Sequence, residues 1–487
     1  MTTITRCNVA PLSVYSPSSE NPWNEQAVNH LYRRVGFGAT RSTTEKALAK
    51  NPSRLIDEII DEALVQNPIP APEWANWIRK QFYDTGENPF EFRRRLKNDW
   101  MDRFFQSNLR ERMTLFWSNH FVTEDHVYNS PAYAYQYYSL LHLHALGNFK
   151  EFTRDIGLNP AMLMYLNGRQ NTKNRPNENY ARELYELFTL GVNNGYTQND
   201  IEETARALTG WNTVEEPWGP ITFDQRKFDN GSKTIFGETG NWGYEDVITI
   251  LFEKHSNKIA KFICKKFYKY FVSPEVNMQV VEELADVFLQ NDFEIAPVLR
   301  KLFKSAHFFD RSTYGVIMKS PIDVQVCLFK ELDFELPGDF EFMNKIRAGS
   351  QLLGQIPLSP VDVAGWQGDT DWIGSATLVA RWNRLNWYIW KSYTHKSEQF
   401  QQFVVQLMDN DADANNVTEI CKKIVDHFLP KAWKNASDYD QALEIFKDQV
   451  PDNYFEDGTW TLSYPSVNRQ VYKLLLFIIR IPEFQLK

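Results

Sequence analysis

NENYARELYELFTLG, at residues 177–191, and YTQNDIEETARALTGW, at residues 196–211, are the two runs that decide the fold. Apolar residues recur in both at the spacing of an amphipathic helix. Gly191 and Gly210 stand where each helix would end. The two runs therefore predict a helical hairpin with a turn over residues 192–196.

Polar residues suited to helix capping precede both runs. Asn177 follows a proline and can cap the first helix. Thr197 and Asp200 have the spacing of a reciprocal cap at the start of the second helix. Both helix starts are therefore predicted by local chemistry as well as by periodicity.

The helical pattern breaks near residues 221–236. Apolar-containing runs there flank Asn230 and Gly231, and an Asn-Gly pair between such runs is typical of a β-hairpin. Lys233 follows the turn, and we expect it to face solvent. The sequence therefore predicts a small β-hairpin excursion within an otherwise helical chain.

The remaining sequence continues the helical pattern on both sides of this excursion. We predict a mainly α fold with one large helical core. Its segments are an extended N-terminal arm (1–22), the first half of the helical core with the hairpin (23–214), the β-hairpin insertion (215–244), and the second half of the core (245–487), with a Gly- and Trp-rich loop (354–374).

Composition excludes several classes of protein. The 487 residues are 43% hydrophobic and 24% charged, as in ordinary globular proteins. Lys and Arg number 53 against 62 Asp and Glu, a formal charge of −9 without an extended basic run. Nucleic-acid binding needs clustered cations, so we expect no nucleic-acid partner. Aromatic residues make up 15%, enough for a large core and for aromatic binding surfaces.

Targeting signals are not apparent in the sequence. The N-terminus has no basic segment followed by an apolar one, so no secretory signal peptide is expected. The most apolar run, residues 474–479, is far shorter than the roughly 20 residues of a spanning helix. We expect a cytoplasmic protein without a transmembrane segment.

Two polar side chains are directed toward apolar helix faces. On a helical projection, His120 falls beside Phe116 and Trp117. Glu183 falls at the edge of the face that carries Leu187. A carboxylate in that position must be paired, protonated or bound to a cation, because burying an unpaired charge is costly.

These two residues are the centre of a predicted site. His120 and Glu183 would form a general-base pair with Arg182, or share a divalent metal ion, while Asn179 and Glu186 would bind substrate. The alternative is a purely structural network of buried polar groups. Arg182 and Glu186 also have the spacing of a simple surface ion pair on one helix.

A second candidate surface is the loop around GWQG, residues 365–368. Trp366 and Trp372 could present their faces to a sugar or an aromatic ligand. Alternatively, both indoles pack against the core. The sequence leaves these alternatives open.

Several motifs together resemble the bacterial domain-of-unknown-function 1800 family. The resemblance extends from about residue 23 onward. It is carried by the hairpin runs and by HLYRRVGFG (30–38), FWSNHF (116–121), LGQIPLSPVDVAGWQG (353–368) and IPEFQ (481–485).

The resemblance implies a large, mostly helical protein of a family without an established activity. Members are often exported, so a periplasmic or exported location is the alternative to a cytoplasmic one. They are frequently encoded beside a sulfatase-like or phosphatase-like protein, which is the expected partner. The family usually has His-Asp where this chain has Phe228-Asp229, and this departure weakens any role that needs a histidine there.

Two functions compete at this stage. The first is a hydrolytic enzyme with the His120 and Glu183 site, acting with or without a metal ion. The second is a noncatalytic envelope or assembly protein that binds a protein partner or a glycan through aromatic surfaces. We give a slight preference to the enzyme.

Overall fold

Helix starts in this chain are set by polar side chains that accept backbone N–H groups. Asn24, Thr197 and Ser320 each cap a helix in this way. The computed structural model describes residues 12–106, 109–335, 340–408 and 415–487. Within these ranges the fold is mainly helical, as predicted, with two small antiparallel sheets of two strands each.

The first half of the chain forms twelve helices among the described residues. They are α1 (Glu25–Val35), α2 (Arg41–Leu48), α3 (Pro52–Val65), α4 (Arg79–Asp84), α5 (Pro89–Gln106), α6 (Leu109–Ser118), α7 (Asp125–Tyr128), α8 (Pro131–Leu143), α9 (Phe149–Gly157), α10 (Pro160–Tyr165), α11 (Asn179–Glu183) and α12 (Gln198–Ala207).

The second half continues with helices after the strands. They are α13 (Tyr244–Phe271), α14 (Met278–Gln290), α15 (Ile295–Phe303), α16 (Pro321–Leu332), α17 (Phe340–Leu352), α18 (Ser375–His395), α19 (Glu398–Leu407), α20 (Val417–Phe428), α21 (Asp440–Lys447), α22 (Asp452–Glu456) and α23 (Val467–Ile478).

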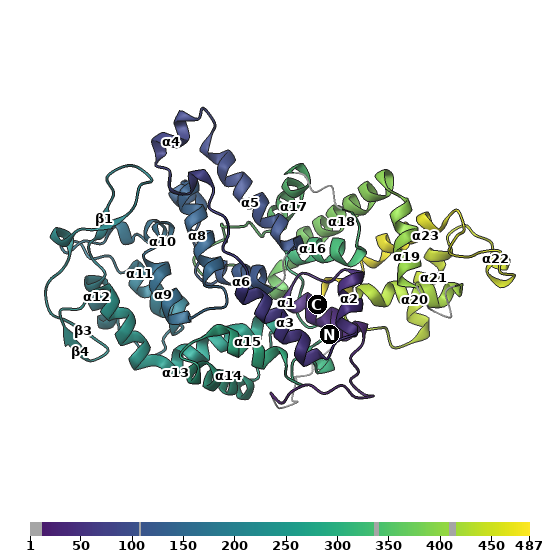
Figure 1. Cartoon of the computed structure of the whole chain (residues 1–487), viewed down its shortest axis with the longest axis horizontal. Helices are drawn as coiled ribbons and strands as arrows, with labels where there is room; N and C mark the ends of the chain where they lie inside the picture. The colour runs from purple at the N-terminus through teal and green to yellow at the C-terminus, as the bar shows by residue number, and fades with distance from the viewer. Residues whose placement is uncertain (1–11, 107–108, 336–339, 409–414) are drawn as a thin grey trace.

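The helices are arranged along one long axis (Figure 1). The strands and α9 to α12 lie at one end, α19 to α23 lie at the other, and α1, α6 and α16 lie in the middle. One hydrophobic cluster of buried residues extends from Leu12 to Phe484. This continuous cluster agrees with a single large core, while the predicted segment boundaries themselves stay predictions.

The predicted helical hairpin is present, but α11 begins after Glu178, and Asn177 accepts the N–H of Asn179 from one residue further upstream. Thr197 and Asp200 form the reciprocal cap of α12, and Gly191 and Gly210 adopt positive φ. The first helix differs in a second respect, because α11 continues as a π-helix over Leu184–Thr189. Such wide turns leave carbonyl groups that other side chains must satisfy.

The β excursion lies where we expected it, but its pairing differs from the predicted hairpin. Strand β1 (Trp211–Thr213) pairs with β2 (Thr222–Phe223), and β3 (Lys233–Ile235) pairs with β4 (Glu238–Gly240). The tight turn therefore falls at Phe236 and Gly237, which both have positive φ as a two-residue hairpin turn requires.

Side-chain contacts explain why Asn230 and Gly231 form a closed loop instead of the hairpin turn. Asp229 accepts the N–H of Gly231 and binds Arg206 of α12. Lys233 is buried, contrary to the sequence expectation, and its ammonium donates to the carbonyls of Asp229 and Gly231. The lysine thus holds the loop from inside.

Buried ion pairs join distant parts of the chain in the middle of the molecule. Arg33 of α1 binds Glu331 of α16, with Nε 2.6 Å from Oε1. Asp323, also on α16, binds Arg112 of α6 and Lys487. Part of the HLYRRVGFG motif is therefore explained, because Arg33 within it supplies the positive charge that pairs with Glu331.

Candidate functional site

His120 lies just after α6 and is buried against the π-helix. Its Nε2 is 3.0 Å from the carbonyl oxygen of Phe188, and its Nδ1 is 2.8 Å from Nζ of Lys266 on α13. A carbonyl oxygen can only accept, so Nε2 carries the proton and Nδ1 accepts from the lysine. Both ring nitrogens of His120 are thus occupied within the protein.

The environment changes the protonation of both partners. Burial and the nearby charge of Lys266 hold the pKa of His120 well below its ordinary value. Burial lowers the pKa of Lys266 to about 7. The pair therefore consists of a neutral imidazole and an amine that changes charge near neutral pH.

The same two side chains satisfy carbonyl groups at the end of the π-helix. The N–H groups of Leu190 and Gly191 both turn back to the carbonyl of Tyr185. Lys266 donates to the carbonyl of Leu187 at 3.2 Å, and Nε2 of His120 donates to the carbonyl of Phe188. The contacts give both residues a structural role at the C-terminal end of the family motif.

Glu183 has a different set of neighbours. It is half-buried on α11, and burial together with the charge of Glu186 raises its pKa. Within the described part of the chain, no hydrogen bond or ion pair joins Glu183 to His120. The catalytic pair stays a prediction that these contacts do not support.

Arg182 forms the surface ion pairs that the helix spacing allows. Its guanidinium binds Glu178 at 2.8 Å and Glu186 at 3.4 Å, and it also donates to Gln198. The side chain of Asn179 makes no hydrogen bond to another described residue. The predicted substrate-binding residues therefore lie on one partly exposed helix face, where Arg182 is already engaged.

The described residues offer no cluster of ligands for the predicted metal ion. Over the described ranges, no group of three or more His, Cys, Asp or Glu residues is placed to hold a metal ion. A metal role for His120 and Glu183 stays a prediction.

The structure places Trp366 and Trp372 in the core. Both indoles are buried, and their ring centroids are 6.4 Å apart. Asn119 holds the loop in place, because its amide accepts the N–H of Trp366 at 2.6 Å and donates to its carbonyl at 2.9 Å. Gly365 has φ +83°, and a Cβ there would lie 2.4 Å from Oδ1 of Asn119. Two family motifs are thus locked together, and the loop offers little indole surface for binding.

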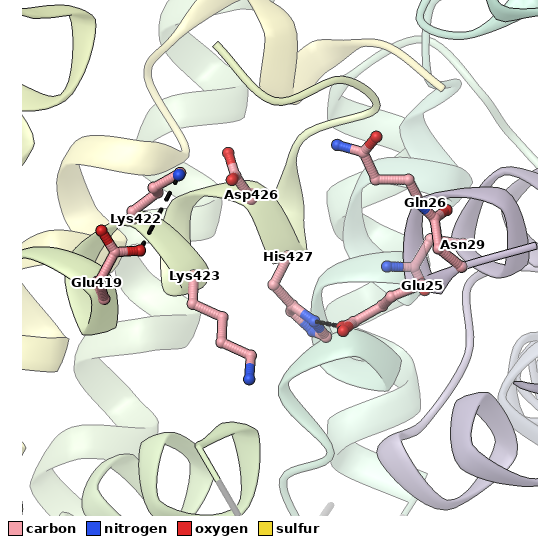
Figure 2. Close-up of a pocket in the computed structure, with 9 residues that line it drawn as sticks. Glu25, Gln26, Asn29, Glu419, Lys422, Lys423, Asp426 and His427 are labelled. Carbon is pink, nitrogen blue, oxygen red and sulfur yellow. Dashed lines mark hydrogen bonds and ion pairs between the residues drawn. The ribbon is translucent and has the colours of Figure 1, made fainter. Parts of the chain in front are cut away.

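A pocket that the sequence did not indicate lies between α1 and α20 (Figure 2). We call it the α1–α20 pocket. It has a volume of about 280 Å³ and is lined by polar and charged side chains. They are Asn24, Glu25, Gln26, Asn29, Glu419, Lys422, Lys423, Asp426 and His427.

His427 connects this pocket to the buried charges. Its Nδ1 is 2.9 Å from Oε1 of Glu25, and its Nε2 is 2.9 Å from the carbonyl oxygen of Glu331. Both ring nitrogens of His427 thus lie within hydrogen-bond distance of an oxygen atom. Burial raises the pKa of Glu25, but His427, together with the charges of Arg41 and Lys423, holds it below its ordinary value.

A second feature that sequence reasoning missed is a group of aromatic and arginine side chains around α4. We call Arg79, Tyr83 and Trp218 the aromatic tip. The side chain of Tyr83 is 55% exposed. The rings of Tyr83 and Trp218 have centroids 6.4 Å apart, and Arg79 lies 5.5 and 5.6 Å from them. In Figure 1, α4 projects from one long side of the molecule.

The backbone of Trp218 is strained. Its φ is +67°, a region that bulky residues rarely adopt. The ring is held by an edge contact with Phe82 at 5.8 Å, and Arg79 donates its N–H to the carbonyl of Pro217 at 2.8 Å. The only early signal for this feature was the high aromatic content, which does not say where the rings gather.

These observations define a large helical protein in which motif residues join distant segments through buried contacts. The chain belongs to the family described as "Protein of unknown function (DUF1800)", which matches residues 30–486. The resemblance drawn from the motifs is therefore confirmed. No curated protein and no solved structure matches the chain. None of the helices in the described ranges is long and apolar enough to cross a membrane.

Proposed function

We propose that this protein is an assembly protein that binds a protein partner through the aromatic tip. The observation that carries the proposal is the half-exposed ring of Tyr83, which lies beside Arg79 and Trp218. Tyr, Trp and Arg dominate the binding energy of protein interfaces, because they combine large apolar surfaces with hydrogen-bonding groups. The composition of the tip therefore suits a protein partner.

The strain at Trp218 supports the same proposal. A bulky residue at positive φ costs of order 1–3 kcal/mol and persists only where the surrounding structure holds it. Here the strained residue places its ring beside Tyr83 on the surface. Strain of this kind clusters at binding and catalytic sites.

We propose the sulfatase-like or phosphatase-like neighbour protein as the partner, as the family resemblance implies. The decisive experiment measures binding between the two purified proteins. Tyr83→Ala and Trp218→Gly should each weaken binding by at least about tenfold, since interface anchors contribute about 2 kcal/mol or more. Glycine at 218 also removes the strain, so this variant loses the ring without an added backbone cost.

A matched control is Trp390→Ala on α18, which removes another exposed aromatic side chain, 48% exposed, from a different surface. It should leave the affinity unchanged. Absence of binding by the wild type, or equal affinity of wild type and both tip variants, contradicts the proposal. Binding of an oligosaccharide in place of the protein would select the glycan alternative. Cell fractionation would decide between the proposed cytoplasmic location and export.

Hydrolysis remains a second candidate because of one observation. Lys266, with a pKa of about 7, touches His120, and a neutral amine can act as a base. The test is an ester-hydrolysis screen of the wild type with His120→Gln and Glu183→Gln. Loss of a measured rate in both variants, with unfolding midpoints unchanged, supports the enzyme. A rate shared by all three proteins removes its basis.

A further inference from the structure

A second cavity, which we call the basic pocket, adjoins the α1–α20 pocket at the start of α1. The two cavities share Asn24 and Gln26, and the basic pocket has a volume of about 370 Å³. Its charged lining residues are Arg311, Lys431 and Lys434, and no carboxylate lines it. Three like charges around one cavity of an acidic protein create a local positive field.

The three cations are not neutralised within the described part of the chain. None of them forms an ion pair or a side-chain hydrogen bond with another described residue. Asp310 is a nearby carboxylate, and it accepts the N–H and the hydroxyl of Ser312. Burial and the charge of Lys434 lower the pKa of Lys431, and the opposing charge of Asp310 does not outweigh them.

The walls of the basic pocket add rigid hydrogen-bond donors. Tyr314 stacks on His30, with ring centroids 3.9 Å apart and planes 7° apart. His30 is itself fixed by the carbonyl of Phe308 at 3.0 Å. Burial raises the pKa of Tyr314, so its hydroxyl keeps its proton and can donate. The side-chain amides of Asn24 and Gln26 donate to no described residue.

We propose that the basic pocket binds a small phosphate or sulfate ester. Arg311, Lys431 and Lys434 would hold the oxyanion, because guanidinium and ammonium groups match its oxygen acceptors. The ring of Tyr314 would contact the organic part of the ligand. The volume falls within the range of small-molecule sites, about 300–1,000 Å³.

The surroundings of the basic pocket favour a small ligand over a polyanion. The adjoining α1–α20 pocket carries Glu25, Glu419 and Asp426 beside Lys422 and Lys423, so its lining has mixed charge. The purely basic lining is therefore confined to one small cavity. A nucleic-acid strand needs an extended basic surface, whereas a single charged group needs only this cavity.

The experiment is titration calorimetry of the full chain at constant ionic strength with inorganic phosphate, inorganic sulfate and phenyl phosphate. We expect saturable binding of at least one inorganic anion and about tenfold tighter binding of phenyl phosphate, because its ring can contact Tyr314. Binding of one inorganic anion and not the other identifies the ester class. No saturable binding of any of the three probes overturns the proposal.

Variants connect the measurement to the site. Arg311→Gln with Lys434→Gln should weaken anion binding by at least about tenfold, because two charge-assisted contacts are lost. Both side chains are exposed, so the unfolding midpoint should not change. The matched control is Lys422→Gln in the α1–α20 pocket. It replaces one lysine by glutamine outside the basic pocket and should leave the affinity for the anion unchanged. Equal affinity of the double variant and wild type would show that the anion binds elsewhere.

Discussion

Lys266 illustrates how a single residue can serve the fold and still respond to pH. It donates to His120 and to the carbonyl of Leu187, while the ring of Phe262 lies 4.8 Å from its ammonium. These contacts hold the amine in a setting where its charge is poorly solvated. Its protonation therefore depends on pH near neutrality, which is unusual for lysine.

This setting predicts a pH-dependent stability. The folded pKa of Lys266 is about 7, against an ordinary value of 10.5. Between these values the unfolded chain holds more protons, so this residue makes stability rise with pH, by at most about 1.4 kcal/mol per pH unit. Urea denaturation from pH 7 to pH 9 gives the free energies of unfolding of wild type and Lys266→Met. Plotted against pH, the two should converge or cross, because the cost of burying a charged Lys266 falls in the wild type as pH rises. Parallel curves would show that the lysine is well solvated.

The surroundings of single residues were only partly predictable from the sequence. Periodicity placed His120 on an apolar face, and the structure confirms it beside Phe116 and Trp117. Its partner Lys266 lies 146 positions away, and no local pattern reports such a pairing. Residue types within one helix indicate burial, whereas contacts between helices depend on how the whole core packs.

At the scale of elements, local chemistry predicted helix ends better than strand pairing. The cap at Thr197 and the glycine at Gly191 act within a few residues, so the sequence contains all that decides them. The Asn230-Gly231 pair carried an equally local signal, but contacts with Arg206 and Lys233 closed that loop. The π-helix likewise depends on the side chains of His120, just after α6, and Lys266 of α13.

Asp200 joins two elements and provides a test at this scale. One carboxylate oxygen accepts the N–H and hydroxyl of Thr197, and the other accepts the N–H of Phe236 at 2.8 Å. Asp200→Ala should cost about 2–3 kcal/mol in the free energy of unfolding, while Thr197→Ala should cost about 1 kcal/mol. Chemical denaturation measures both. Equal losses would mean that the contact with Phe236 contributes nothing.

At the scale of the whole molecule, buried ion pairs connect α1 to α16 and α16 to Lys487. The pair Arg33–Glu331 is only 1% exposed on both sides. Motif analysis cannot predict pairing across such sequence distances. It also cannot predict the α1–α20 pocket, which Glu25 and His427 help to line. Arg33 lies in one of the family motifs, but the motif does not say what its side chain contacts.

Removing one partner of this buried pair should be strongly destabilising. Glu331→Gln leaves the guanidinium of Arg33 without its counter-charge and should lower the free energy of unfolding by about 3–5 kcal/mol. The carboxylate has a pKa held below its ordinary value, chiefly by Arg33 against the opposing effect of burial. Its contribution is therefore present above pH 4.5 and lost as pH falls through the folded pKa.

Urea denaturation at pH 7 and at lower pH checks both statements. Glu58→Gln, which breaks the exposed pair with Lys50, is the matched control and should leave the unfolding midpoint unchanged. An unchanged midpoint in Glu331→Gln would show that water or another group replaces the lost charge.

The contact between Arg34 and Lys487 has a consequence for synthesis on the ribosome. The guanidinium of Arg34 donates to the carbonyl of Lys487, which is 453 positions later in the chain. At a translation rate of about 5–20 residues per second, the helix that carries Arg34 waits roughly 20–90 s for this acceptor. During that interval Arg34 lacks this acceptor, so the last contacts of α1 form only after the rest of the described chain has been made.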